Sequence, residues 1–317
     1  MRARENFGGR GRGAAQVRAR CDSGKLALND APNEKPRNTA DYRQRRCATA
    51  AAKLRPNRLS SRAVRPIIIA AGRGMRLGHN TDEIPKTLVP VLGRPMLDWI
   101  LEALASAGFA RKDVVCISGY AEDVLRARYP EFTFVKNEDF ANNNILLSLL
   151  CARAYLGDGF LSTYADIVYE GEIVQKLVAS SADICLGCDT AWRRRYLGRT
   201  QHPESDAEKL RADGARVLEI SRTIPSERAD GEFIGVMKLS ADGARVFLDA
   251  FDRAERSYGA GVFREGRTFQ KAYLLDLLQE MLEAGAVMQR ENTHGGYMEI
   301  DTGQDLAMAE AWWKARP

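Results

Sequence analysis

Long hydrophobic runs are missing from this chain of 317 residues. No apolar stretch approaches the ~20 residues of a membrane-spanning helix, and no secretory h-region is present, so no membrane partner is predicted. Cysteine is scarce too, and six cysteines in a chain of this size do not build a disulfide framework. Cys185 and Cys188 form a C-x-x-C, but their apolar surroundings favour a core strand. The expected compartment is the reducing cytoplasm.

Histidine is equally scarce. The three histidines, His79, His202 and His294, share no metal-ligand spacing, and no Ser-His-Asp pattern emerges. No metal or catalytic role is therefore predicted for a histidine.

Positive charge is abundant but confined to one end. Residues 1–65 hold 17 Lys and Arg against 5 Asp and Glu, a net charge of +12, which leaves −7 for residues 66–317 out of a total of +5. The first segment has few large apolar residues, so a disordered basic extension is predicted there. An over-extended gene start is favoured for it, with a transit peptide or an RNA-binding arm as alternatives. Because the remainder is acidic, no nucleic-acid partner is predicted for it.

Strand-like and helical patterns alternate after residue 66. Strands are expected at 67–71, 113–118, 132–136 and 159–164, with helices at 95–108 and 144–155. This alternation predicts one α/β domain, 66–317, with a Rossmann-like, mostly parallel sheet and helices on both faces. The second half, with strands at 184–188, 216–221 and 233–239 and helices at 241–256 and 270–284, is expected to extend that sheet as a mixed sheet.

The segment 66–95, PIIIAAGRGMRLGHNTDEIPKTLVPVLGRP, is the most informative part of the chain. A β-branched run that stops at glycines indicates a buried strand opening into a loop close to a ligand. Glycine lets backbone N–H groups converge on phosphate oxygens, and basic side chains add positive charge. The sequence therefore predicts a nucleoside triphosphate site. The residues expected to form it are Ala70, Ala71, Gly72, Gly74, Arg76 and Lys86.

Two familiar glycine-rich loops do not fit this segment. A dinucleotide fingerprint requires a third glycine where Leu77 stands, and Gly78 comes one residue late. A Walker A loop requires a glycine before the lysine, but Lys86 follows Pro85.

Two aspartates follow apolar strand-like runs in distant parts of the chain. Asp166 stands in Y-A-D-I-V-Y and Asp301 in M-E-I-D-T. Reactions of a nucleoside triphosphate develop negative charge on phosphate oxygens, and carboxylates are the ligands that Mg²⁺ prefers. We predict that the two aspartates share one Mg²⁺. The alternative is that each aspartate caps the helix that follows it.

The pattern G-x-G-x-R followed by P-K resembles the signature of the GT-A-like nucleotidyltransferases. That family includes sugar-1-phosphate nucleotidyltransferases and bacterial phosphocholine cytidylyltransferases. The resemblance implies that Arg76 and the loop amides bind the departing phosphates and that Lys86 binds the α-phosphate. It also implies metal-binding roles for Asp166 and Asp301, the latter followed here by Q-D-L. By the same resemblance, Gly119, Tyr120, Asn144 and Ser148 are expected to lie against the nucleotide. For Asn144 and Ser148 the alternative is a polar helix start with Asn144 as its cap.

The acceptor side is predicted less sharply. An aromatic face together with an anion holds an ammonium group well, and the acceptor-binding residues expected in the second half are Asp189, Trp192, Phe233 and Glu299. Tyr196 and Tyr273 are further aromatic candidates. Core packing is the alternative role for each aromatic residue.

The reading of the whole sequence is a Mg²⁺-dependent nucleotidyltransferase that moves a cytidylyl group from CTP to a small phosphate or phosphonate monoester such as phosphocholine. A sugar-1-phosphate nucleotidyltransferase and a non-catalytic nucleotide-binding regulatory module remain alternatives. The sequence leaves open the exact acceptor, the base preference, the pathway and whether the chain forms a homo-oligomer.

Overall fold

The computed structural model of the chain describes residues 64–266 and 268–315. The predicted extension therefore lies outside the described residues except for its last two positions. β1 (Arg65–Ala70) begins one residue before the predicted domain start, and Val64 is already buried. The boundary between extension and domain stays a prediction.

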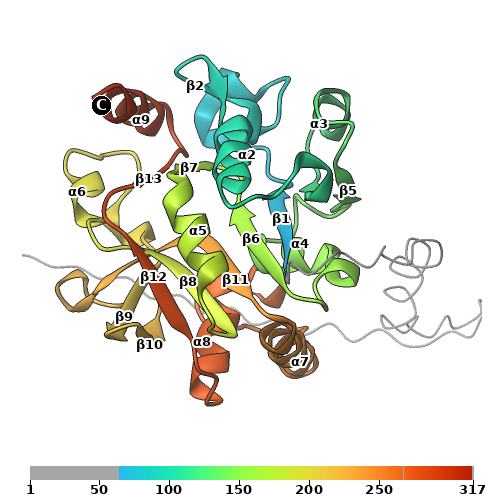
Figure 1. Cartoon of the computed structure of the whole chain (residues 1–317), viewed down its shortest axis with the longest axis vertical. Helices are drawn as coiled ribbons and strands as arrows, with labels where there is room; N and C mark the ends of the chain where they lie inside the picture. The colour runs from blue at the N-terminus through green and yellow to red at the C-terminus, as the bar shows by residue number, and fades with distance from the viewer. Residues whose placement is uncertain (1–63, 267, 316–317) are drawn as a thin grey trace, which may run out of the picture. The chain divides into compact units, whose positions relative to one another are not determined.

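One sheet runs through both halves of the described chain (Figure 1). Four neighbouring strands are parallel, and β11 lies antiparallel between this group and a mixed group. In the mixed group β12 is parallel to β8, whereas β10 and β9 follow antiparallel. The prediction of a Rossmann-like sheet with a mixed extension is confirmed. In spatial order the strands are β5 (Thr133–Lys136), β4 (Val115–Ser118), β1, β6 (Phe160–Tyr164), β11 (Gly231–Leu239), β8 (Ile184–Asp189), β12 (Gln289–Thr293), β10 (Arg216–Ile220) and β9 (Lys209–Asp213).

Helices cover both faces of this sheet, because alternate residues of a strand point to opposite sides. Ile67 and Ile69 of β1 pack into the apolar cluster formed with α4 (Ile145–Cys151), α7 (Ala241–Tyr258) and α8 (Leu274–Glu283). Ile68 packs into the cluster on the other face. The helices of that second cluster are α2 (Met96–Ser106), α3 (Glu122–Arg128) and α5 (Gly171–Ala179).

A small two-stranded ladder outside the main sheet brings the segments of Asp166 and Asp301 together. β7 (Ile167–Tyr169) pairs antiparallel with β13 (Tyr297–Glu299), and the N–H of Ile300 donates to the carbonyl of Asp166 at 2.9 Å. Asp166 and Ile300, which are 134 positions apart in the sequence, thus lie side by side. The remaining named elements are β2 (Pro90–Val91), β3 (Arg94–Pro95), α6 (Arg193–Tyr196) and α9 (Gly303–Lys314).

Short 3₁₀ segments connect these elements, and three of them carry residues of the site. They are Met75–Thr81, Lys86–Leu88 and Glu204–Asp206. The others are Arg111–Asp113, Arg153–Tyr155, Ser226–Arg228 and Phe269–Lys271.

Two strands of the main sheet were not predicted. β12 reads QRENT and has no apolar alternation, and β9 reads KLRAD and ends directly before the turn at Gly214. Both form because backbone groups of neighbouring strands pair with them, which is a tertiary effect. The expected core strand around Cys185 and Cys188 is β8, in which both thiols are buried. Among the described helices, none combines the length and apolar character needed to cross a membrane.

Candidate functional site

A cavity of about 580 Å³ lies at the carboxyl ends of β1 and β6. Ala71 and Gly72 follow β1 and line it, and Tyr164 and Asp166 line it at the end of β6. Ligands of open α/β sheets bind at such strand ends. The cavity is therefore where the fold would place a ligand.

The predicted glycine loop divides into residues that line the cavity and residues that shape it. Gly72 lines the cavity and has open space beside its Cα. Gly74 has φ +77°, and a Cβ there would meet the Lys86 side chain at 2.7 Å. Because only glycine suits this left-handed backbone at such a close approach, Gly74 lets Lys86 reach the site. Ala70, one residue before Ala71, ends β1 and is buried.

Gly119 and Tyr120 support the loop from behind rather than lining the cavity. The N–H of Tyr120 donates to the carbonyl of Ala71 at 3.1 Å, and a Cβ on Gly119 would come within 2.6 Å of that same oxygen. By contrast, Asn144 and Ser148 of the α4 segment do line the cavity. The Ser148 hydroxyl accepts from Asn137 Nδ2 at 2.9 Å.

Lys86 joins the two predicted metal-binding aspartates. Its Nζ donates to Asp166 Oδ2 at 2.7 Å and also contacts Asp301, and Arg76 contacts the other carboxylate oxygen of Asp301. Burial alone would lower the pKa of Lys86, but the two carboxylates raise it above the ordinary value of lysine. For Asp301, burial would raise the pKa, and the nearby Lys86 and Arg76 cations lower it below the ordinary value.

One atom of this group is suited to a further cation. Asp166 Oδ1 is buried and has no hydrogen-bond partner among the described residues. A buried carboxylate oxygen without a partner is costly, and Mg²⁺ takes oxygen ligands of this kind. Asp166 and Asp301 therefore fit a divalent metal ion.

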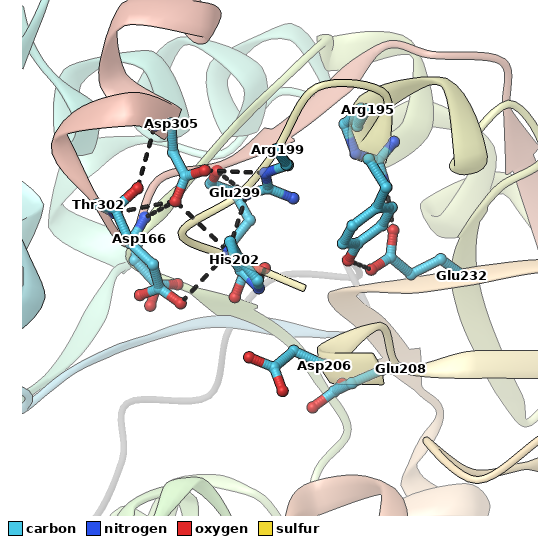
Figure 2. Close-up of polar contacts among 12 residues, drawn as sticks. Asp166, Arg195, Arg199, His202, Asp206, Glu208, Glu232, Glu299, Thr302 and Asp305 are labelled. Carbon is cyan, nitrogen blue, oxygen red and sulfur yellow. Dashed lines mark hydrogen bonds and ion pairs between the residues drawn. The ribbon is translucent and has the colours of Figure 1, made fainter. Parts of the chain in front are cut away.

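His202, for which no role was predicted, lies beside these carboxylates (Figure 2). It is 1% exposed, and its Nε2 is 3.4 Å from Glu299 Oε2. His202, Glu299 and Asp301 each offer one ligand atom, and these three atoms lie within 4.8 Å of one another. The sequence held no signal for this, because His202 stands in a loop without periodicity, about 100 positions from its partners.

Asp305 organises the loop that carries Asp301. Its carboxylate accepts from the N–H groups of Thr302 and Asp301 at 2.9 and 3.1 Å and from Arg199 Nε at 2.8 Å. In return, the Thr302 hydroxyl accepts from the N–H of Asp305, which forms a capping box at the start of α9. Burial would raise the pKa of Asp305, but His202 and Arg199 hold it below the ordinary value of aspartate.

Replacing Asp305 by asparagine is therefore expected to lower the free energy of unfolding by about 3 kcal/mol, because Arg199 is left buried without its anion. A depressed pKa in the folded state stabilises the protein above the unfolded pKa of about 3.9, and this contribution is lost as the pH falls below it. Urea unfolding of both proteins should show a constant difference between pH 8 and pH 5 that shrinks below about pH 4. A variant as stable as the wild type would contradict this role.

The structure separates the four predicted acceptor residues. Glu299 lines the cavity. Asp189 is fully buried elsewhere, where it accepts from the N–H groups of Ala191 and Gly295 at 2.8 Å and pairs with Arg195. Arg195 also pairs with Glu232 (Figure 2).

The two aromatic residues of that prediction are buried as well. Trp192 is 2% exposed and packs against Tyr196, and Phe233 is 2% exposed in the main core. Neither residue lines the cavity.

Three side chains outside the predicted set line the cavity, namely Asp206, Glu208 and Arg222. Tyr273, one of the further aromatic candidates, lines it as well. Arg222 Nη2 donates to Asp206 Oδ1 at 2.6 Å, and its guanidinium lies over the Tyr273 ring, 4.9 Å from the centroid. The acidic stretch P-E-S-D-A-E was visible in the sequence, but nothing in it indicated which carboxylates face a ligand.

The known proteins to which this chain is similar are nucleotidyltransferases. Residues 66–219 match the MobA-like NTP transferase domain. A CTP:phosphoglutamine cytidylyltransferase of Campylobacter jejuni is 26% identical over 250 residues, which cover 76% of this chain and 96% of that protein. A 2-aminoethylphosphonate cytidylyltransferase of Lancefieldella rimae is 34% identical over 111 residues, which cover 34% of this chain but only 42% of that protein.

Among solved structures, the CTP:phosphocholine cytidylyltransferase of Streptococcus pneumoniae is similar with a TM-score of 0.57 and 22% identity. The match covers 79% of this chain and 99% of that one. At this identity the likeness concerns the fold.

Proposed function

We propose that the chain is a nucleotidyltransferase that transfers a cytidylyl group from CTP to a small phosphate or phosphonate monoester, and the match of residues 66–219 to the MobA-like NTP transferase domain supports this. The observation that carries the proposal is the convergence of Lys86, Asp166 and Asp301 beside the glycine loop. CTP is proposed because the similar proteins of C. jejuni and L. rimae are cytidylyltransferases.

The proposed chemistry is an in-line displacement at the α-phosphorus of CTP. An oxygen of the acceptor phosphate forms the new P–O bond, and the bond to pyrophosphate breaks. The attacking oxygen is already anionic at neutral pH, so no general base is required. Rate acceleration then comes from positioning and from charge stabilisation.

The basic residues are assigned to the phosphates of CTP. We assign Arg76 and the amides of Gly72 and Gly74 to the β- and γ-phosphates, and Lys86 to the α-phosphate. The proximity of Arg76 and Lys86 to the same carboxylate supports this, because two cations there can stabilise charge that spreads over the transferring and leaving groups. Asn144 and Ser148, with Gly119 and Tyr120 behind the loop, are proposed for the nucleoside.

Asp166 and Asp301 are proposed to hold Mg²⁺. The buried Asp166 Oδ1 without a partner among the described residues supports this assignment. When bound, the ion would neutralise negative charge on the triphosphate.

The test is a screen of pyrophosphate release. ATP, GTP, UTP and CTP are each combined with phosphocholine, phosphoethanolamine, 2-aminoethylphosphonate and glucose-1-phosphate in the presence of Mg²⁺. We expect release with CTP and at least one of the first three acceptors. Release with glucose-1-phosphate alone would favour the sugar-1-phosphate alternative. Nucleotide binding without release under any condition would favour the regulatory module.

A further inference from the structure

The cavity holds more acidic groups than a metal ion requires. Asp166, Glu299 and Asp301 lie near one another around Lys86 and His202, whereas Asp206 and Glu208 belong to a different segment of the wall. Figure 2 shows these last two carboxylates next to each other and pointing to the same side. Substrates of the proposed reaction are polyanions, so this second acidic group calls for a separate explanation.

Asp206 already has its counter-ions. It accepts from Arg222 Nη2 at 2.6 Å, and Arg76 Nη1 lies 4.0 Å from its other oxygen.

Glu208 differs from Asp206 in this respect. Among the described residues, the recorded hydrogen-bond donor to its carboxylate is the Tyr164 hydroxyl, 3.2 Å from Oε2 and 3.5 Å from Oε1. One hydroxyl has one proton to donate, whereas a carboxylate has about four acceptor sites. Burial raises the pKa of Glu208 to about 8, and the Tyr164 hydrogen bond and the charge of Arg222 offset this only in part. Without a ligand the group is therefore largely protonated at neutral pH, and a bound cation would favour its carboxylate form. This cavity-lining carboxylate therefore has acceptor sites left for a ligand.

We propose that Glu208 binds a primary ammonium group of the acceptor. This inference rests on the proposed function and names the class of acceptor: a small phosphate or phosphonate monoester with a primary amine. A primary ammonium offers three N–H donors, which the two oxygens of Glu208 can accept while Tyr164 holds the carboxylate in place.

A quaternary ammonium fits this place less well. It has no N–H donor, so the half-buried carboxylate of Glu208 would gain no hydrogen bond from it beyond the one from Tyr164. Aromatic faces hold quaternary groups instead, and Phe140, Tyr164 and Tyr273 line the cavity. The guanidinium of Arg222 already lies over the ring of Tyr273, Phe140 packs against Tyr120, and Tyr164 directs its hydroxyl to Glu208. The acceptor is therefore expected to resemble phosphoethanolamine rather than phosphocholine.

The experiment compares three acceptors that differ only at the amine end: phosphoethanolamine, phosphocholine and ethyl phosphate. With CTP and Mg²⁺, kcat/KM of the wild type is expected to be at least about 100-fold higher for phosphoethanolamine than for ethyl phosphate, because a polar group built to bind a substrate donor discriminates strongly against its absence. In Glu208→Gln this ratio should fall below about 10, while the KM for CTP stays within about twofold.

Two further variants make the result specific. Tyr164→Phe removes the hydroxyl that holds Glu208 and should lower the same ratio by a smaller factor. Glu227→Gln changes an exposed carboxylate and should leave the ratio unchanged. Thermal unfolding of each variant shows that it is folded.

The outcomes separate the inference from the proposed function. An unchanged ratio in Glu208→Gln and in Tyr164→Phe, or a wild type that uses phosphocholine as well as phosphoethanolamine, would overturn the inference and leave cytidylyl transfer standing. No pyrophosphate release from the wild type with any acceptor would overturn both.

Discussion

Lys86→Ala is expected to lower kcat by at least two orders of magnitude while the protein stays folded. The ammonium is buried at the point where the glycine loop and both aspartates meet, so no mobile surface lysine can replace it. Loss of one preorganised charged donor typically costs about 3 kcal/mol of transition-state stabilisation, which corresponds to a factor of about 100 or more. The measurement is pyrophosphate release at saturating CTP and acceptor.

Two companion variants define what this loss means. Lys86→Met keeps most of the side-chain volume beside Gly74 and should be as slow as Lys86→Ala, since the charge is what matters. Lys112→Ala, at an exposed position, should retain wild-type turnover. If folded Lys86→Ala kept more than about a tenth of the wild-type kcat, the role assigned to Lys86 would be wrong.

Asp166→Asn and Asp301→Asn are each expected to remove nearly all Mg²⁺-dependent turnover. A metal ion supplies several kcal/mol of charge stabilisation in such reactions, so a loss of at least about 100-fold is expected. An amide oxygen is a weaker ligand than a carboxylate, and neither change alters side-chain size. Rates are measured as Mg²⁺ is titrated, and CTP binding is followed separately by calorimetry, where weakened binding should persist.

The control for both changes is Asp249→Asn, an exposed carboxylate on α7. It should leave the Mg²⁺ titration unchanged. Wild-type rates at ordinary Mg²⁺ concentrations in either site variant would refute the shared-metal assignment. The effects should also differ in kind, because Asp301 pairs with Arg76 as well as Lys86 and its loss frees both cations.

Most of the fold could be predicted from hydrophobic patterns within single segments of the sequence. Ile67 to Ile69 alternate between two helical layers, and a run of this composition followed by glycines can hardly form anything but a buried strand that opens into a loop. β12 escaped prediction because its five residues are polar, and only pairing with β8 makes them a strand. No local rule contains that partner.

The residues of the candidate site show the same difference between local sequence patterns and distant contacts. Asp166 and Asp301 could be found from sequence because each follows a strand, and a strand end is a local feature. His202 and Glu208 could not, because their loop takes shape from distant contacts such as the one between Arg199 and Asp305. Arg222 also follows a strand, but an arginine at a strand end is not by itself a sign of a ligand site. Trp192 and Phe233 were chosen by residue type, and that type suits an apolar core as well as a ligand cage.

The Lys86 bridge between the two aspartates has a consequence for how charged ligands enter. In the free protein the carboxylates and the cations of Lys86 and Arg76 already neutralise one another. When a triphosphate and a divalent cation arrive together, each can take over one half of an existing ion pair. On binding, Lys86 and Arg76 exchange a carboxylate partner for a phosphate, so no unpaired charge is neutralised. The affinity for CTP should accordingly depend only weakly on ionic strength, although the nucleotide is a polyanion.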